Sequence, residues 1–376
     1  MGKIVAKIVL TGGPCAGKTS ALSKIEEIFT EKGYKVLVVG ESATEIIKGG
    51  IRPFGINAID MYSFQDIILM YQYQKEKIYE EAVTKMDDDT KCIIVYDRGM
   101  NDNKAYINQK QFTELLKKHN LNELELLDNY DMVLHLVTAA DGAENFYTLG
   151  NNTARTETIS EARQLDNKTV NAWAGHSNLK IISNEVSFEE KMAKVINEIN
   201  NLLGEPVTIK TQKKYLIDLD KTDLSFLNED NSTDIQIIQH YLNEKNGLET
   251  RLRARKFEQQ ESYYLTVQIK EKNGKATVLT DKKITKKEYN RLLETHPDAC
   301  TITKVRKSFT LNKQYYRLDI FDGFAILEVE PTIENEKVEI PDNFVIIKEV
   351  TDDPYYDNRV MAGLSKSNKQ KTLIKP

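Results

Sequence analysis

The sequence predicts two domains of different classes: an α/β domain with a mostly parallel, doubly wound sheet, then an α+β domain whose antiparallel strands form a barrel. Residues 1–204 alternate short apolar runs with amphipathic stretches, the pattern of strand–helix–strand units. After Gly204-Glu205-Pro206 the helical periodicity fades, and short alternating runs continue to residue 362. The chain has 376 residues, enough for two separate cores.

The composition favours a cytoplasmic protein with no nucleic-acid partner. A net charge of −5 argues against general nucleic-acid binding. The three cysteines have no C-x-x-C spacing, so they indicate neither a disulfide framework nor a zinc site. No apolar run approaches the ~20 residues of a membrane span, and the N-terminus enters a strand at once, unlike a signal peptide.

The first strand, loop and helix carry the most specific motif. Lys3–Leu10 is an apolar, β-branched run that predicts a buried strand, and Thr19–Lys32 has the period of an amphipathic helix. The loop between them matches G-x-x-x-x-G-K-[ST], the P-loop, whose backbone N–H groups surround a di- or triphosphate at a helix N-terminus. The motif predicts a nucleotide site made of Gly12, Gly13, Pro14, Cys15, Ala16, Gly17, Lys18, Thr19 and Ser20.

Four side chains carry the expected chemistry. Lys18 would reach the β- and γ-phosphates, and Thr19 would ligate Mg²⁺ that arrives with ATP or GTP. Asp97 ends a predicted strand, Cys92–Tyr96, where such folds place a metal-organising residue or a base, although a turn aspartate is the alternative. Glu41 would contact the substrate or an attacking water.

The other elements predicted for the first domain are strands at Lys35–Val39, Met132–Val137 and Lys180–Ile182 and helices at Ser42–Lys48, Tyr62–Met86 and Phe188–Leu203. The carboxyl ends of parallel strands share one edge of the sheet, so the P-loop, Glu41 and Asp97 should converge there. The polar stretch Tyr147–Gln164 carries Arg155 and Arg163.

An ordered set of motifs runs through residues 4–203: the P-loop, Glu41 with Ala43-Thr44, Tyr96-Asp97-Arg98-Gly99 with Asp102 and Tyr106, Phe146-Tyr147, Asn151-Asn152, Ala154-Arg155, Glu161-Ala162, Leu165-Asp166, Trp173 and Gly175-His176. This set resembles the AAA-type ATPase/kinase domain of nicotinamide riboside kinases and TRPL-translocation-defect proteins. The resemblance implies a small-molecule-kinase-like site. Arg155 and Arg163 would then be lid arginines that neutralise the transferring phosphoryl group, or else solvated helix arginines.

In the second half we predict strands at Thr211–Leu219, Glu249–Arg255, Tyr263–Lys270, Thr301–Phe309, Tyr315–Phe321 and Ala325–Val329 and helices at Ser232–Asn243 and Lys286–Glu294. Charged residues two apart share a face, in the rows Arg251/Arg253/Arg255, Lys304/Arg306 and Glu328/Glu330. Three arginines on one face of an ordinary sheet would repel one another, whereas inside a barrel they can hold a polyanion. A solvated outer face is the alternative.

The motifs of residues 206–362 include Lys214-Tyr215-Leu216-Ile217, the Arg251/Arg253 pair, Lys304/Arg306, Leu327-Glu328-Val329-Glu330 and Tyr355-Tyr356-Asp357-Asn358. They resemble the CYTH domain of triphosphate tunnel enzymes. The resemblance implies a tunnel that binds a phosphorylated anion through Lys214, Arg251, Arg253, Arg255, Lys270, Lys304, Arg306, Glu328 and Glu330.

One departure concerns the metal of that family. Its opening E-x-E-x-K is here Lys210, Gln212 and Lys214, and Val278–Lys283 offers only Asp281 as an acid. Metal-dependent triphosphate hydrolysis needs several carboxylates around the ion. We therefore expect anion binding without triphosphate hydrolysis in this domain.

The last residues, 363–376, carry four lysines and no acid, which predicts a disordered basic tail, with peripheral contact to anionic lipid as the alternative. Together these patterns predict a nucleotide-binding phosphotransferase or NTPase with an anion-binding second domain. Two other functions remain open: a nucleotide-switched regulator that binds phosphoinositide or polyphosphate, and a metal-dependent triphosphatase.

Overall fold

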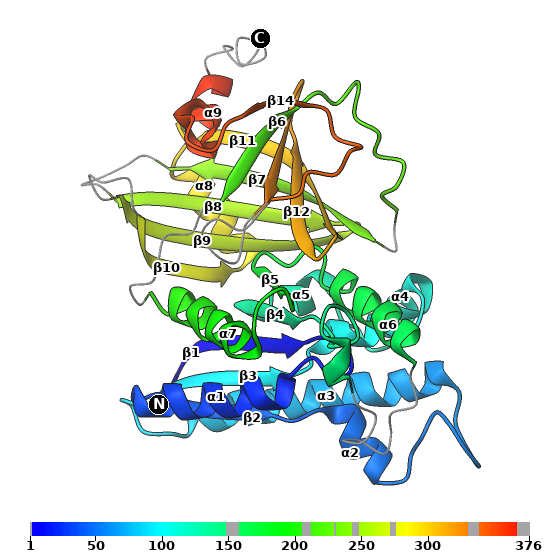
Figure 1. Cartoon of the computed structure of the whole chain (residues 1–376). Helices are drawn as coiled ribbons and strands as arrows, with labels where there is room; N and C mark the ends of the chain where they lie inside the picture. The colour runs from blue at the N-terminus through cyan, green and yellow to red at the C-terminus, as the bar shows by residue number, and fades with distance from the viewer. Residues whose placement is uncertain are drawn as a thin grey trace.

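The computed structural model describes residues 2–147, 158–204, 212–228, 231–242, 248–270, 276–329 and 338–366. They form two stacked units, each built on one sheet (Figure 1). Sheet A has five parallel strands and sheet B has nine, which confirms the predicted fold class. The division at residue 204 stays a prediction. Arg155, Glu330 and residues 367–376 of the predicted tail lie outside the described residues.

Sheet A consists of β1 (Lys3–Thr11), β2 (Lys35–Val39), β3 (Lys91–Asp97), β4 (Met132–Leu136) and β5 (Leu179–Ile182), in the order β2-β3-β1-β4-β5. Its helices are α1 (Lys18–Glu31), α2 (Ser42–Lys48), α3 (Met61–Thr84), α4 (Gln109–Lys118), α5 (Glu123–Leu127), α6 (Ile159–Asn171) and α7 (Phe188–Leu202), with 3₁₀ turns η1 (Met100–Ala105) and η2 (Glu144–Phe146). The predicted strands and helices of this half are confirmed to within three residues at each end.

Helices cover both faces of sheet A because its strands are apolar on both sides. Ile8 and Leu10 of β1 pack with Phe29 of α1 and Val195 of α7. Val9, between them in sequence, packs on the opposite face, in the core cluster that α3, α4 and α5 complete. This is the doubly wound arrangement, and it brings the carboxyl ends of β1, β3 and β4 to one edge.

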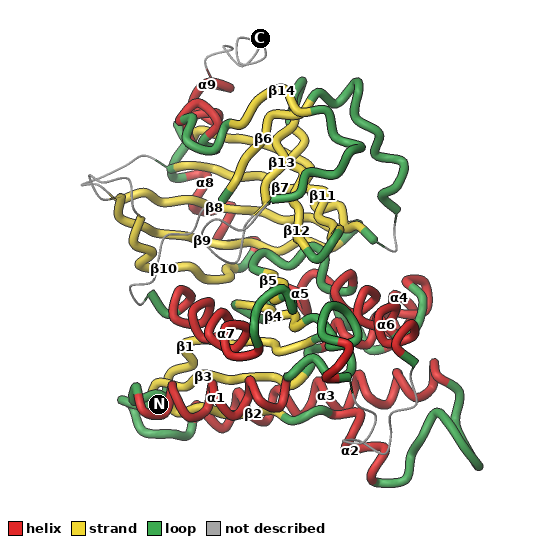
Figure 2. The backbone as a smooth tube through the Cα atoms, viewed as in Figure 1, coloured by secondary structure: helices red, strands yellow, loops and turns green. Residues whose placement is uncertain are grey.

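Sheet B consists of β6 (Lys213–Ile217), β7 (Ser232–Tyr241), β8 (Leu248–Phe257), β9 (Gln260–Lys270), β10 (Ala276–Ile284), β11 (Cys300–Leu311), β12 (Gln314–Ile320), β13 (Ala325–Val329) and β14 (Ile346–Glu349). Helix α8 (Lys286–Glu294) was predicted correctly, and η3 (Pro354–Tyr356) and α9 (Asn358–Lys366) follow β14. The strand order is β10-β9-β8-β7-β11-β12-β13-β6-β14, and the sheet curls strongly (Figure 2). Strand β6 therefore lies between two strands that come much later in the chain.

The helix predicted at Ser232–Asn243 is wrong, because this segment forms β7. Burial alternates along the strand: Ile235 and Ile237 are buried, while Asp234 and Gln236, each one residue before them, are exposed. Ile235, Ile238 and Leu242 have the i, i+3, i+7 spacing of a helix, but pairing with β8 and β11 satisfies the backbone on both sides.

The strand register gives sheet B a charged inner face. Arg255 is paired with Ile237, and Ile237 with Lys304, so these side chains share a face. The same register continues from Arg306 through Asp319 to the strands beyond. We call this the inner face, defined by Lys214, Gln239, Arg251, Arg253, Arg255, Tyr264, Thr266, Lys304, Arg306, Arg317, Asp319 and Glu328. The predicted sharing of one face by the basic rows is confirmed.

Each end of the inner face is covered. Met361 and Ala362 of α9 pack with Tyr241 and Ile302 at one end. At the other end Leu124 of α5, which belongs to the first unit, packs with β7. The charged middle of the inner face therefore lies between two apolar contacts, one made by α9 and the other by α5 of the first unit.

The contact between the two units is polar as well as apolar. Arg255 forms an ion pair with Asp128, and both side chains are 4% exposed. The Arg255 guanidinium also donates to the Gly175 carbonyl at 2.7 Å, and the Ser262 hydroxyl donates to Asp128 at 2.8 Å. The Tyr315 hydroxyl donates to the carbonyl of His176 at 3.0 Å. These contacts fix the second unit against the 173–176 turn of the first.

Candidate functional site

The P-loop lies at the carboxyl edge of sheet A, between β1 and α1, as predicted. Gly12 has φ of 136°, and a Cβ there would lie 2.0 Å from the Leu136 carbonyl oxygen. Only glycine can therefore occupy this position. The start of the loop therefore packs directly against the end of β4. Residues 14–20 line a cleft.

Lys18 is folded back onto its own loop. Its amine donates to the carbonyls of Gly12 and Gly13 at 2.9 and 3.0 Å. Burial, and next the positive charge of Arg98, lower the pKa of Lys18 to about 8. A bound phosphate would supply the negative charge that favours the protonated amine.

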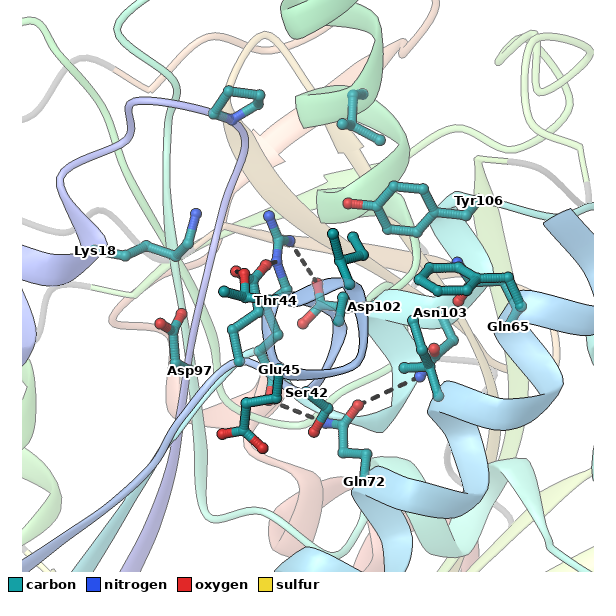
Figure 3. Close-up of a pocket in the computed structure, with 18 of the residues that line it drawn as sticks. Lys18, Ser42, Thr44, Glu45, Gln65, Gln72, Asp97, Asp102, Asn103 and Tyr106 are labelled. Atoms are coloured by element: carbon teal, nitrogen blue, oxygen red, sulfur yellow. Dashed lines mark hydrogen bonds and ion pairs between the residues drawn. The ribbon is translucent and has the colours of Figure 1, made fainter. Parts of the chain in front are cut away.

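The cleft has a volume of about 900 Å³ and runs from the P-loop past α2 to α3. In Figure 3, Lys18 and Asp97 lie at one side and Gln65, Asn103 and Tyr106 at the other. Apolar side chains of α3, among them Phe64 and Ile68, complete the far wall. The volume is at the upper end of the range for small-molecule sites.

Glu41 and Arg98 form an ion pair in the cleft, with Nε and Oε1 2.6 Å apart. Burial raises the pKa of Glu41, but the charges of Arg98 and Lys18 outweigh it and lower the pKa to about 2. Thr44 also donates to Glu41, at 2.5 Å. Glu41 is thus a fixed carboxylate and a weak base.

Asp97 is the carboxylate with spare bonding capacity. Its Oδ1 atom is buried and has no hydrogen-bond partner within the described ranges. Burial raises its pKa above the usual range, although the nearby Lys18 lowers it. Thr19 lines the same cleft, so an oxygen pair is available to Mg²⁺ that accompanies a nucleotide.

Sequence reasoning missed Arg98 and the network behind it. Arg98 adopts a left-handed backbone with φ of 71°. Its Nη1 atom is buried, has no hydrogen-bond partner in the described part of the chain and lies 4.0 Å from Asp102. Asp102 in turn accepts from the Gly99 N–H at 2.8 Å and from Trp173 Nε1 at 3.3 Å. The sequence motif Asp97-Arg98-Gly99 contains this arginine, but only the fold shows that Arg98 faces the cleft.

The structure does not bring Arg163 into the cleft lining as described. Its guanidinium donates to the Ala140 carbonyl and to Glu144, each at 2.6 Å. The lid role predicted for it stays a prediction.

On the inner face of sheet B, one group of cations is already neutralised. Lys304 and Arg306 both pair with Asp319 at 2.6 Å. These two charges lower the pKa of Asp319 despite its burial, which would raise it. Glu328 contacts Arg306 at 3.0 Å and Arg317 at 3.5 Å.

These pairs do not fit a metal centre. The buried carboxylates of the inner face, Asp319 and Glu328, are each engaged by cationic side chains, and Glu249 accepts from Arg359 at 2.7 Å. No cluster of three or more His, Cys, Asp or Glu suited to a metal ion occurs among the described residues. The expectation that this domain binds an anion without hydrolysing triphosphate stays a prediction.

A second group of inner-face atoms has spare bonding capacity. The Nε atoms of Arg251 and Arg253, the Tyr264 hydroxyl and Gln239 Oε1 are buried and have no hydrogen-bond partner in the residues described. Arg253 lies over the Tyr264 ring at 4.9 Å. Burial, and next the charge of Arg251, lower the pKa of Arg253. These four groups converge because their positions pair directly or diagonally across β7, β8 and β9.

Three predicted tunnel residues differ in placement from this group. Arg255 lies on the inner face but is engaged by Asp128 of the first unit. Lys214 lies 3.9 Å from Glu328. Lys270 ends β9, at the edge of the described residues.

A strand, a glycine-rich loop and a helix that present Lys18 and Thr19 to a cleft define a P-loop nucleotide-binding domain, here followed by an antiparallel sheet with a charged inner face. Residues 7–191 match the family model described as "AAA domain". No curated protein sequence matches the chain. The resemblance to nicotinamide riboside kinases stays a prediction.

Two solved structures illustrate what the chain is similar to. The inorganic triphosphatase NE1496 is 22% identical, with 42% of this chain and 95% of that chain covered and a TM-score of 0.31. A conserved hypothetical protein from Pyrococcus furiosus is 18% identical, with 34% and 81% covered and a TM-score of 0.25. Within the described ranges no helix is long and apolar enough to cross a lipid bilayer.

Proposed function

We propose that the first unit is a phosphotransferase that moves the γ-phosphoryl group of ATP or GTP to a hydroxyl group of a small molecule. The observation that carries the proposal is the Asp97 Oδ1 atom, which is buried and has no partner among the described residues. It lines a cleft that continues beyond the P-loop to α3, so a second molecule has room opposite the phosphates.

In this proposal, different residues of the cleft have different roles in phosphoryl transfer. Lys18 neutralises the β- and γ-phosphates and Arg98 contacts the transferring group; that Arg98 lines the cleft and that its buried Nη1 has no hydrogen-bond partner in the described residues support this role. The acceptor oxygen forms a bond to the γ-phosphorus, the bond from phosphorus to the β–γ bridging oxygen breaks, and the hydroxyl proton goes to Asp97. Asp97 suits this role better than Glu41, because burial raises its pKa whereas the pKa of Glu41 is about 2.

Mg²⁺ bound with the nucleotide would supply charge neutralisation at the phosphates, and Thr19 would hold it. A nucleoside-like acceptor fits the far wall, because a ring can lie against Phe64 and Ile68. Gln65 Oε1 and Ser42 Oγ are buried without a partner in the described chain and can bond to polar groups of the acceptor.

The test is product detection with labelled ATP and GTP and a panel of hydroxyl acceptors, including nucleosides and nicotinamide riboside. A new phosphorylated compound supports the proposal. Lys18→Ala and Asp97→Asn should abolish it, whereas Lys24→Ala, an exposed lysine on the same helix, should not. Release of inorganic phosphate alone, whatever acceptor is present, contradicts the transferase and favours the nucleotide-switched regulator.

A second function is supported by the inner face of sheet B. We propose that Arg251 and Arg253 bind a phosphorylated anion, with Tyr264 and Gln239 as hydrogen-bonding partners, and that this binding needs no metal. Buried guanidinium atoms without partners in the described structure support an anionic ligand.

Calorimetry with tripolyphosphate in the presence of a chelator tests this function in the full chain. Arg251→Met and Arg253→Met should each weaken binding, whereas Lys256→Met, at an exposed side chain on the opposite face of β8, should leave it unchanged. Binding that requires Mn²⁺, or phosphate release from tripolyphosphate by Lys18→Ala protein, would instead support the triphosphatase.

A further inference from the structure

Asp166 is a buried carboxylate that touches the P-loop from behind. It lies on α6, and its Oδ1 atom accepts from the Gly13 N–H at 2.6 Å and from the Thr138 N–H at 3.3 Å. The side chain is not part of the described cleft lining, although its neighbour Leu165 is. Asp166 therefore contacts the loop without reaching the ligand.

The approach is close enough to determine the loop residue. A Cβ on Gly13 would lie 2.7 Å from Asp166 Oδ1 and 3.1 Å from the Thr138 side chain. Gly13 also offers its carbonyl to Lys18 at 3.0 Å. Gly13 is thus held through its N–H by Asp166 and through its carbonyl by the phosphate-binding lysine.

A carboxylate behind an anion-binding loop is electrostatically unfavourable unless it is compensated. His135 is the side chain beside it: its Nε2 lies 3.3 Å from Asp166 Oδ1, and the side chain is 1% exposed. Although burial raises the pKa of Asp166, His135 and the two backbone N–H groups outweigh it and lower the pKa. Asp166 in turn raises the pKa of Lys191, although burial lowers that pKa to about 8.

We infer that Asp166, paired with His135, is a positioning residue that fixes Gly13 and, through it, Lys18 in the geometry that receives a nucleoside triphosphate. The pair also connects the P-loop to α6, the helix that supplies Leu165 to the cleft. The inference rests on the proposed nucleotide binding and adds a residue to that site which no motif of the loop contains.

The experiment measures the affinity of the full chain for ATP with Mg²⁺ by fluorescence titration. Asp166→Asn keeps the shape but loses the charge, and we expect it to weaken ATP binding by about tenfold, the usual effect of a lost charge-assisted hydrogen bond. The control is Glu123→Gln, a buried carboxylate of the same unit that pairs with Lys104 and is not part of the described cleft lining, and its ATP affinity should not change. If transfer activity is found, the KM for nucleotide should rise more than kcat falls.

His135→Asn tests the same inference from the other partner, because it removes the imidazole that lies beside Asp166 without changing a residue of the loop. It too should weaken ATP binding, and the double variant should lose less than the product of the two single effects. If Asp166→Asn does not fold, the ATP affinity of His135→Asn still tests the inference. Equal ATP affinity in wild type, Asp166→Asn and His135→Asn overturns the inference alone. A wild-type protein that binds neither ATP nor GTP overturns the proposed function and the inference with it.

Discussion

The ion pair between Asp128 and Arg255 predicts a large loss of stability when one partner is removed. Both side chains are 4% exposed. In Asp128→Asn the guanidinium of Arg255 would stay buried. Its remaining strong acceptor would be the Gly175 carbonyl, 2.7 Å away. Removing one member of a buried pair costs about 3–5 kcal/mol, because the other charge is left without compensation. We expect a loss of about 3 kcal/mol, since the amide can still accept from Ser262.

The assay is urea unfolding followed by fluorescence of Trp173, the one tryptophan in the sequence. The matched control is Glu125→Gln, which breaks a second, more exposed cross-unit pair, with Lys283 at 3.2 Å; those side chains are 54% and 42% exposed. That change should cost at most about 1 kcal/mol. Asp128→Asn combined with Arg255→Met should recover most of the lost stability. If Asp128→Asn costs no more than Glu125→Gln, the reasoning about burial is refuted.

Three other predictions follow from the first unit. Because the pKa of Lys18 is about 8 and phosphate binds the protonated amine, ATP affinity should fall between pH 7 and 9.5 in wild type but not in Lys18→Arg; a flat wild-type titration would contradict this. Burial raises the pKa of Glu76 to about 8, so the folded state holds a proton that the unfolded state loses above pH 4.5. Stability should therefore fall by on the order of 4 kcal/mol from pH 4.5 to 8 in urea unfolding, and Glu76→Gln should remove that slope. Gly99→Ala would place a Cβ 2.6 Å from Trp173, so we expect a loss of about 1–3 kcal/mol and a shifted Trp173 emission spectrum.

The parts predicted from the sequence are those fixed by local spacing. The P-loop between Lys3–Leu10 and its helix, and the carboxylate at the end of Cys92–Tyr96, follow from motif and periodicity within a few dozen residues. Period two likewise placed the arginine row of β8 on one face. The helix predicted for β7 failed because Ile235 fits both periods: Ile238 and Leu242 follow it at helical spacing, and Ile237 and Tyr241 follow it at period two. Only the neighbouring strands decide between them.

The rest depends on contacts between distant segments. Arg98 faces the cleft because Gly99 fits against Trp173, which is far away in sequence. Arg255 looked like a tunnel residue from its spacing, yet its partner, Asp128, comes from the other unit. Asp166 could be quoted as part of a motif, but nothing in its neighbours indicates that it bonds to Gly13.

The position of β6 in sheet B has a consequence for synthesis on the ribosome. Both of its neighbours, β13 and β14, are translated after it, and about 110 residues separate Ile217 from Ala325. At 5–20 residues per second, β6 waits on the order of 5–20 s for its first partner, whereas sheet A is complete by Ile182. During that interval the nascent chain carries an unpaired strand beside an already folded first unit. Codon changes that slow translation between β6 and β13 should therefore reduce the soluble yield without altering a single residue.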